Sequence, residues 1–143
     1  MEMKALCSKV SQVNLPFFTK GDITTIDSSV SLFEVDRIAE SVNPYAIRKQ
    51  PGFEELEKSV LRSMKYPIIL IGNNSVNYDR AKSGMRNPWD MQGFYPNRSY
   101  LCIFGNQRLE IARKNGYTHI SAVCTWDINK AIVMGNHFEN SSV

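Results

Sequence analysis

Short apolar runs bounded by chain-breaking residues constrain the fold of this chain more than any other feature. Residues 68–71, Ile-Ile-Leu-Ile, lie between a proline and a glycine, and residues 100–104, Tyr-Leu-Cys-Ile-Phe, end at Gly105. Apolar runs of this length with such borders are typical of buried β-strands. A third strand is predicted over residues 119–126, and an earlier one over residues 32–36.

Helices are predicted between these strands. Residues 53–64 place apolar side chains at helical spacing on one face, which favours an amphipathic helix. A second helix is expected from Asn106 to Asn115, where Asn115-Gly116 is a good helix C-terminus. Asn43-Pro44 predicts a turn, because the residue before a proline is pushed out of the helical region.

The length of 143 residues predicts one domain with a single core. We divide the chain into an N-terminal arm (1–30), a folded domain (31–126) that carries a long insert (73–99), and a C-terminal tail (127–143). The longest apolar run is too short to span a bilayer, and the N-terminus lacks the layout of a signal peptide. These features predict a cytoplasmic protein that does not enter a membrane.

Charge and cysteine content limit the chemistry. The net charge of +3 permits an anionic ligand without indicating a dedicated nucleic-acid-binding domain. The three cysteines form no CxxC pair, so a disulfide framework or a zinc knuckle is not expected. His119 and His137 have no third ligand at useful spacing, and we predict no metal site from them.

The junction between the strand at 100–104 and the following helix is the sharpest local signal. Gly105-Asn106-Gln107-Arg108 opens the helix, where free backbone N–H groups and the helix dipole favour an anion. Gly105 allows the backbone to approach a phosphate closely, and Arg108 could fold back to contact it. The alternative is a tight turn in which Asn106 caps the helix and Arg108 is solvated.

A series of short segments resembles the ParB N-terminal domain of the ParB/sulfiredoxin-like superfamily, in the order of that family. Residues 100–112 are similar to its "Y-x-I-I-x-G-E-R-R-x-x-A-A" and residues 116–123 to its "G-x-x-x-I-P-A-x-V". The first half of the family pattern is matched by residues 35–38, Asn43-Pro44 with Arg48, residues 53–60 and residues 67–70. The resemblance covers roughly residues 31–126.

This resemblance implies a compact α+β fold with a mixed β-sheet and packed helices. It also implies a stand-alone module that binds a nucleoside triphosphate, ATP or CTP, and hydrolyses it slowly at most. The nucleotide would be bound by Gly105, Asn106, Gln107 and Arg108, with Arg48 near the same phosphates. Mg²⁺ could join the site through carboxylates of the 34–40 segment.

Departures from the family pattern narrow the function. Sulfiredoxins carry a cysteine where this chain has Asn106, so sulfiredoxin chemistry is not expected. ParB carries a glutamate and two arginines where this chain has Asn106, Gln107 and Arg108, which puts metal coordination and a preference for CTP in doubt. Residues 127–143 are too few for the helix-turn-helix domain that follows in ParB, so chromosome-partition function in the full sense is not expected. A module of this kind would suit a phage or mobile element.

The insert 73–99 is rich in asparagine and is predicted to be mostly loop. It also offers a second set of contacts. It carries four cations that could bind DNA weakly and without sequence preference: Arg80, Lys82, Arg86 and Arg98. Trp89 and Tyr95 could stack on bases or anchor the insert to the core. Two alternatives to a binding module stay open. One is an enzyme of the same superfamily, either a small-molecule kinase with Glu40 as general base or a ParB-type nuclease; the other is a protein-partner binder with a decayed nucleotide site.

Overall fold

The computed structural model describes residues 18–19, 30–62, 66–83 and 93–141, with side chains up to residue 136. It has six strands in one sheet, ordered β1-β6-β4-β5-β3, with β2 also paired to β6. The strands are β1 (Phe18–Thr19), β2 (Val30–Glu34), β3 (Ile38–Glu40), β4 (Ile68–Gly72), β5 (Tyr100–Phe104) and β6 (His119–Thr125).

The sheet is mixed. β6 runs parallel to β4 and antiparallel to β1 and β2, whereas β5 runs antiparallel to β4 and parallel to β3. The prediction of an α+β fold with a mixed sheet is therefore confirmed at this level. The strands predicted at 68–71, 100–104 and 119–126 are also confirmed.

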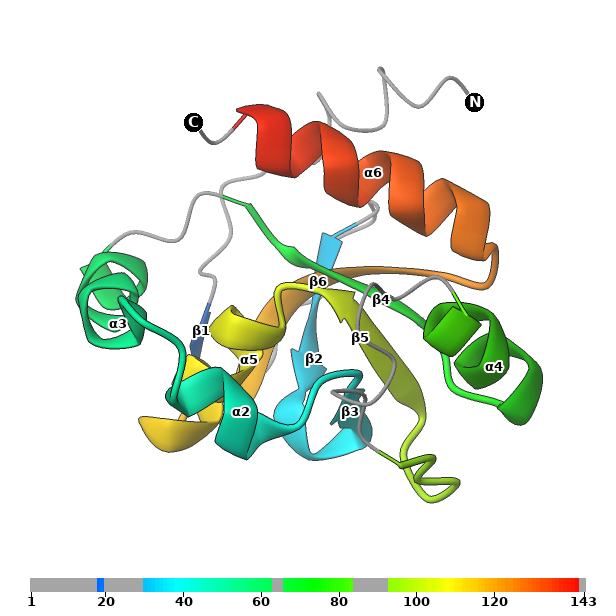
Figure 1. Cartoon of the computed structure of the whole chain (residues 1–143), viewed down its shortest axis with the longest axis horizontal. Coiled ribbons are helices and arrows are strands. Elements are labelled where there is room, and N and C mark those ends of the chain that lie inside the picture. The colour runs from blue at the N-terminus through cyan, green and yellow to red at the C-terminus, as the bar shows by residue number, and fades with distance from the viewer. Residues whose placement is uncertain (1–17, 20–29, 63–65, 84–92, 142–143) are drawn as a thin grey trace.

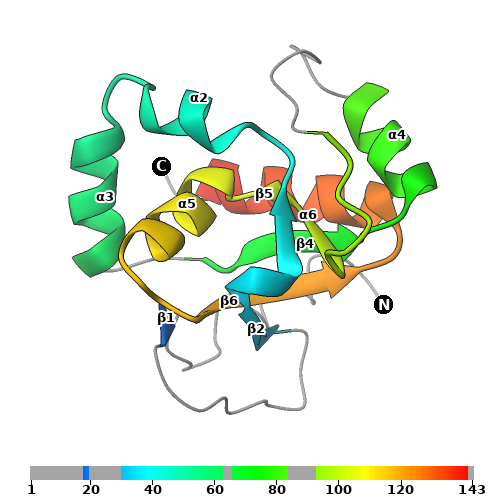
Figure 2. The same ribbon diagram turned by 90° about the horizontal axis from the view of Figure 1, so that it is seen from below.

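Helices cover both faces of the sheet (Figures 1 and 2). Three lie on one face: α2 (Pro44–Arg48), α3 (Phe53–Arg62) and α5 (Asn106–Lys114). The long α6 (Ile128–Ser141) covers the other face. α4 (Ser75–Ser83) lies at one side of the sheet and contacts α6.

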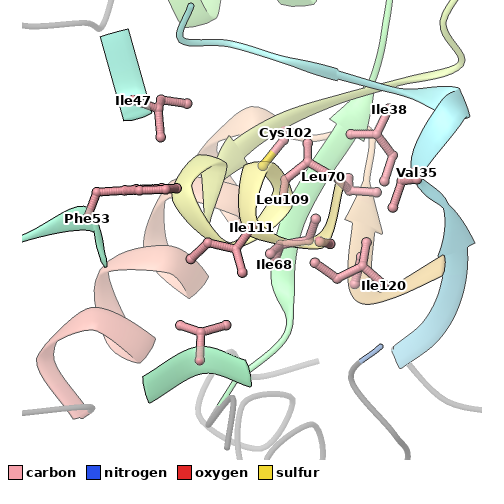
Figure 3. Close-up of a cluster of buried hydrophobic side chains, with 13 residues drawn as sticks. Val35, Ile38, Ile47, Phe53, Ile68, Leu70, Cys102, Leu109, Ile111 and Ile120 are labelled. Carbon is pink, nitrogen blue, oxygen red and sulfur yellow. The ribbon is translucent and has the colours of Figure 1, made fainter. Parts of the chain in front are cut away.

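The central strands alternate their side chains between two apolar clusters. Ile68 and Leu70 of β4 pack with Leu109 of α5, and this cluster is drawn in Figure 3. Ile69 and Ile71 pack on the opposite face with Met134 of α6. All five residues of β4 are buried, because the strand is covered on both faces.

Three expectations from the sequence need correction. Asn43-Pro44, predicted as a turn, instead begins α2: Asn43 is the N-cap, and its Oδ1 accepts a hydrogen bond from the Tyr45 N–H at 2.9 Å. The first part of the insert 73–99 is helical and not loop, because α4 occupies residues 75–83. The segment 127–143, predicted as a C-terminal tail, contains α6, which packs three apolar residues into the core.

Two further boundaries differ slightly. The strand predicted over 32–36 ends at Glu34 and passes into a short 3-10 turn, η1 (Val35–Arg37). The helix predicted over 53–64 is seen to Arg62, and residues 63–65 lie outside the described residues. Among the described residues, no helix is both long and apolar enough to cross a bilayer.

Candidate functional site at the start of α5

Gly105 opens α5 in a left-handed conformation, with φ of 96°. A Cβ at this position would lie 2.5 Å from Cγ2 of Ile68, so the turn needs glycine for both backbone conformation and space. Residues 105–108 are all partly exposed. The first turn of α5 thus reaches the surface directly after β5, which lies between β4 and β3 in the sheet, as an anion site at a helix start requires.

Asn106 is tied to the segment that follows β3. Its Oδ1 accepts from the Ser41 N–H at 3.0 Å, and its Nδ2 donates to Ser41 Oγ at 2.9 Å. Ser41 is buried. The side chain therefore does not act as the N-cap that the alternative interpretation of the turn assumed; Gly105 takes the cap position, with no side-chain hydrogen bond.

Arg108 lies beside Gly105 but points to the start of β4. Its Nη1 donates to the carbonyl of Tyr66 at 2.5 Å and reaches that of Pro67 at 3.4 Å. These contacts join α5 to residues more than 40 positions earlier in the chain. The guanidinium thus has a structural role in this arrangement, and a role in phosphate binding stays a prediction.

Arg48 of α2 reaches the second turn of α5. Its Nε and Nη2 donate to Oε1 of Glu110 at 3.3 and 2.8 Å. The Arg48 side chain is 52% exposed and that of Glu110 only 2%. The second carboxylate oxygen of Glu110 is buried and has no hydrogen-bond partner within the described part of the chain. Glu110 is therefore a buried anion that depends on one half-exposed cation.

Gln107 Nε2 also donates to Oε1 of Gln50. We use the term seam for the three contacts that join residues 41–50 to α5, namely Asn106–Ser41, Arg48–Glu110 and Gln107–Gln50. The seam thus includes three of the five residues predicted to bind nucleotide, Asn106, Gln107 and Arg48. Gly105 caps α5 immediately before Asn106, and Arg108 contacts the segment before β4 instead.

Glu40, the candidate general base, is buried and paired with the guanidinium of Arg113 in the last turn of α5. Arg113 also donates to the carbonyls of Val35, at 2.6 Å, and Ile38. Burial lowers the pKa of Arg113, and the nearby Asp36 partly opposes this. Because the carboxylate of Glu40 is engaged by a guanidinium inside the fold, its contacts favour a structural role.

Metal and thiol chemistry find little support. In the described ranges, no group of three or more His, Cys, Asp or Glu side chains could hold a metal ion. Glu34 pairs with Arg37, and Glu40 pairs with Arg113 in the last turn of α5, so we assign no step to Mg²⁺. Burial raises the pKa of Cys102 to about 12 and that of Cys124 to about 11, so neither thiol ionises near neutral pH.

The described cations of the insert lie on two segments, α4 and the stretch before β5. Arg80 and Lys82 are exposed in the last turn of α4. Arg98 is half-buried and its guanidinium donates to the carbonyl of Asp36. Arg86 and Trp89 lie outside the described residues. Phe94 and Tyr95 are exposed, and Phe94 packs against Tyr78 of α4 with ring centroids 5.5 Å apart.

Several residues that hold these segments together were missed from the sequence. Glu110 and Ser41 carried no recognisable signal, because their partners lie more than 60 positions away. Asn73 donates through Nδ2 to the carbonyls of Tyr95 and Arg98, at 2.8 and 2.9 Å. Asn77 is buried and donates to the carbonyl of Gly72 at 2.8 Å. The asparagines taken as loop markers therefore close the base of the insert.

The chain matches no family model, no curated protein and no solved structure.

Proposed function

We propose that this protein is a nucleotide-binding module that holds the phosphates of a nucleoside triphosphate, ATP or CTP, at the first turn of α5. The observation that carries the proposal is the left-handed Gly105, which brings a partly exposed helix start without a side-chain cap to the end of β5, an interior strand of the sheet. The first N–H groups of a helix have no partners within it, and the helix dipole attracts negative charge.

Charge around this turn supports the proposal. Arg48 is half-exposed and held against α5, and Lys49 follows it on the same exposed segment. Basic side chains beside a helix start add to its attraction for phosphate. The resemblance of residues 31–126 to the ParB N-terminal domain points to the same turn and the same class of ligand.

Binding is better supported than turnover. Slow hydrolysis, a kinase or a nuclease activity would each need a group that activates water or substrate, and Glu40 is engaged by Arg113. We therefore place the enzyme alternatives second. Weak DNA binding through the insert belongs to the same proposal, with the exposed Arg80 and Lys82 as its contacts.

A charge placed at the first turn tests the site. Gln107→Glu keeps the size of the side chain, and the amide of Gln50 can flip to preserve their hydrogen bond. We expect this variant to lose at least about tenfold in affinity for ATP or CTP, because the new carboxylate repels phosphate at close range. Its free energy of unfolding should stay level or rise by about 0.3–1 kcal/mol, since the helix dipole favours the charge.

Asn129→Asp is the matched control. It makes the same amide-to-carboxylate change in the first turn of α6, on the opposite face of the sheet. A melting-temperature screen with ATP, ADP, CTP and GTP finds the ligand, because a ligand that binds only the native state raises that temperature. Calorimetric titration then gives the affinities. The proposal fails if none of the four nucleotides stabilises the wild-type protein, or if both variants bind as the wild type does.

A further inference from the structure

Tyr45 is the most exposed large apolar side chain of the described residues, at 67%. Its N–H is used to cap α2, but its ring contributes little to the core. The ammonium group of Lys49 lies 4.1 Å from the ring centroid. Tyr45, Arg48 and Lys49 are spaced i, i+3 and i+4, and so share one face of this helical segment.

This face is held in place relative to the first turn of α5. Asn106 holds Ser41 just before α2, Glu110 holds Arg48, and Gln107 contacts Gln50 just after it. Both views of the fold place α2 against α5. Glu110 adds a buried oxygen without a hydrogen-bond partner in the described residues, which marks the seam as a polar site rather than simple packing.

A protein partner fits Tyr45 less well than a small ligand. Stable protein interfaces bury about 800 Å² per partner around an apolar centre. The other exposed large apolar side chains in the described part of the chain lie on α3, on α4, in the insert, after β6 and on α6, and none of them is on α2. A single aromatic ring with Lys49 over one of its faces, and Arg48 on the same helical segment, is instead a suitable surface for one base on the opposite ring face and for its phosphates.

We propose that Tyr45 is the platform on which the base of the nucleotide stacks, with Lys49 and Arg48 facing its phosphates. The inference rests on the proposed function and deepens it: the site takes a nucleoside triphosphate in preference to an inorganic polyphosphate. Stacking uses the face of the base, so Tyr45 supplies affinity without selecting one base.

The test compares ATP with inorganic tripolyphosphate on the full chain by calorimetry. Tyr45→Ala should weaken ATP binding by about 5- to 100-fold, the range for losing one stacked base. Tripolyphosphate binding should change by less than about twofold. Tyr45→Phe keeps the ring and should bind ATP as the wild type does. Trp126→Ala removes an equally exposed ring, at 65%, away from the seam and should also leave ATP binding unchanged.

The outcomes separate this inference from the proposal beneath it. Equal ATP affinity for Tyr45→Ala and wild type overturns the inference, and so does an equal loss for both probes. Tripolyphosphate that binds the wild type as tightly as ATP overturns the stacking role while leaving the phosphate site. A wild type that binds neither probe and none of the other nucleotides overturns the proposed function, and the inference falls with it. Tyr45→Leu keeps the comparison possible if the alanine variant does not fold.

Discussion

At the scale of single residues, the two side chains of the Arg48–Glu110 ion pair differ in exposure, and so the loss of either should have a different effect on stability. Arg48→Ala leaves Glu110, 2% exposed, as an uncompensated buried charge, and should cost about 3 kcal/mol, the lower end for breaking a buried pair. Glu110→Gln leaves Arg48, which half-faces solvent, and should cost less. Chemical denaturation measures the free energy of unfolding of both variants. The double variant Arg48→Ala/Glu110→Gln should be more stable than Arg48→Ala alone. Equal losses for the two single variants would contradict this account.

At the scale of elements, the packing of α6 on the sheet depends on a glycine. A Cβ at Gly135 would lie 2.2–2.4 Å from ring atoms of Phe104 in β5. Gly135→Ala should therefore destabilise the fold by about 1–3 kcal/mol through overpacking, although alanine favours a helix. The adjacent Asn136→Ala, at an exposed position, should be neutral or slightly stabilising. Thermal denaturation compares them; a stabilised Gly135→Ala would show that α6 is not held closely on the sheet.

At the scale of the whole molecule, a net charge of +3 supports only weak DNA binding. The sequence suggested four insert cations, but Arg98 is engaged by the carbonyl of Asp36, which leaves Arg80 and Lys82 exposed in the described residues. The logarithm of the DNA-binding constant falls with the logarithm of the salt concentration, with a slope of about −0.9 for each neutralised phosphate. The double variant Arg80→Ala/Lys82→Ala should therefore make this slope less negative by about 2. Fluorescence anisotropy over a salt series measures it. Binding that depends on DNA sequence or resists salt would contradict a backbone-only mode.

The sequence by itself determined the elements with strong local signals. The apolar strands β4 and β5, the amphipathic α3 and the glycine-opened α5 were all predicted within about two residues, because hydrophobic period and chain breakers act over a few positions. Prediction from local signals was wrong where one segment carries signals for two kinds of secondary structure. Asn43-Pro44 was read as a turn although an asparagine before a proline also caps a helix, and α4 has too weak an amphipathic pattern to stand out among asparagines.

Only the tertiary structure decided which side chains meet. Arg108 turns to the carbonyls at the start of β4, Asn106 to Ser41, and Arg48 to Glu110, across 41 to 65 positions of the chain. The partner of a polar side chain depends on which distant backbone segment the packing brings beside it, and local propensity carries no record of that. The sequence therefore located the turn at Gly105, whereas the fold determined that Arg108 contacts the carbonyls before β4 and that Arg48 pairs with Glu110 in the second turn of α5.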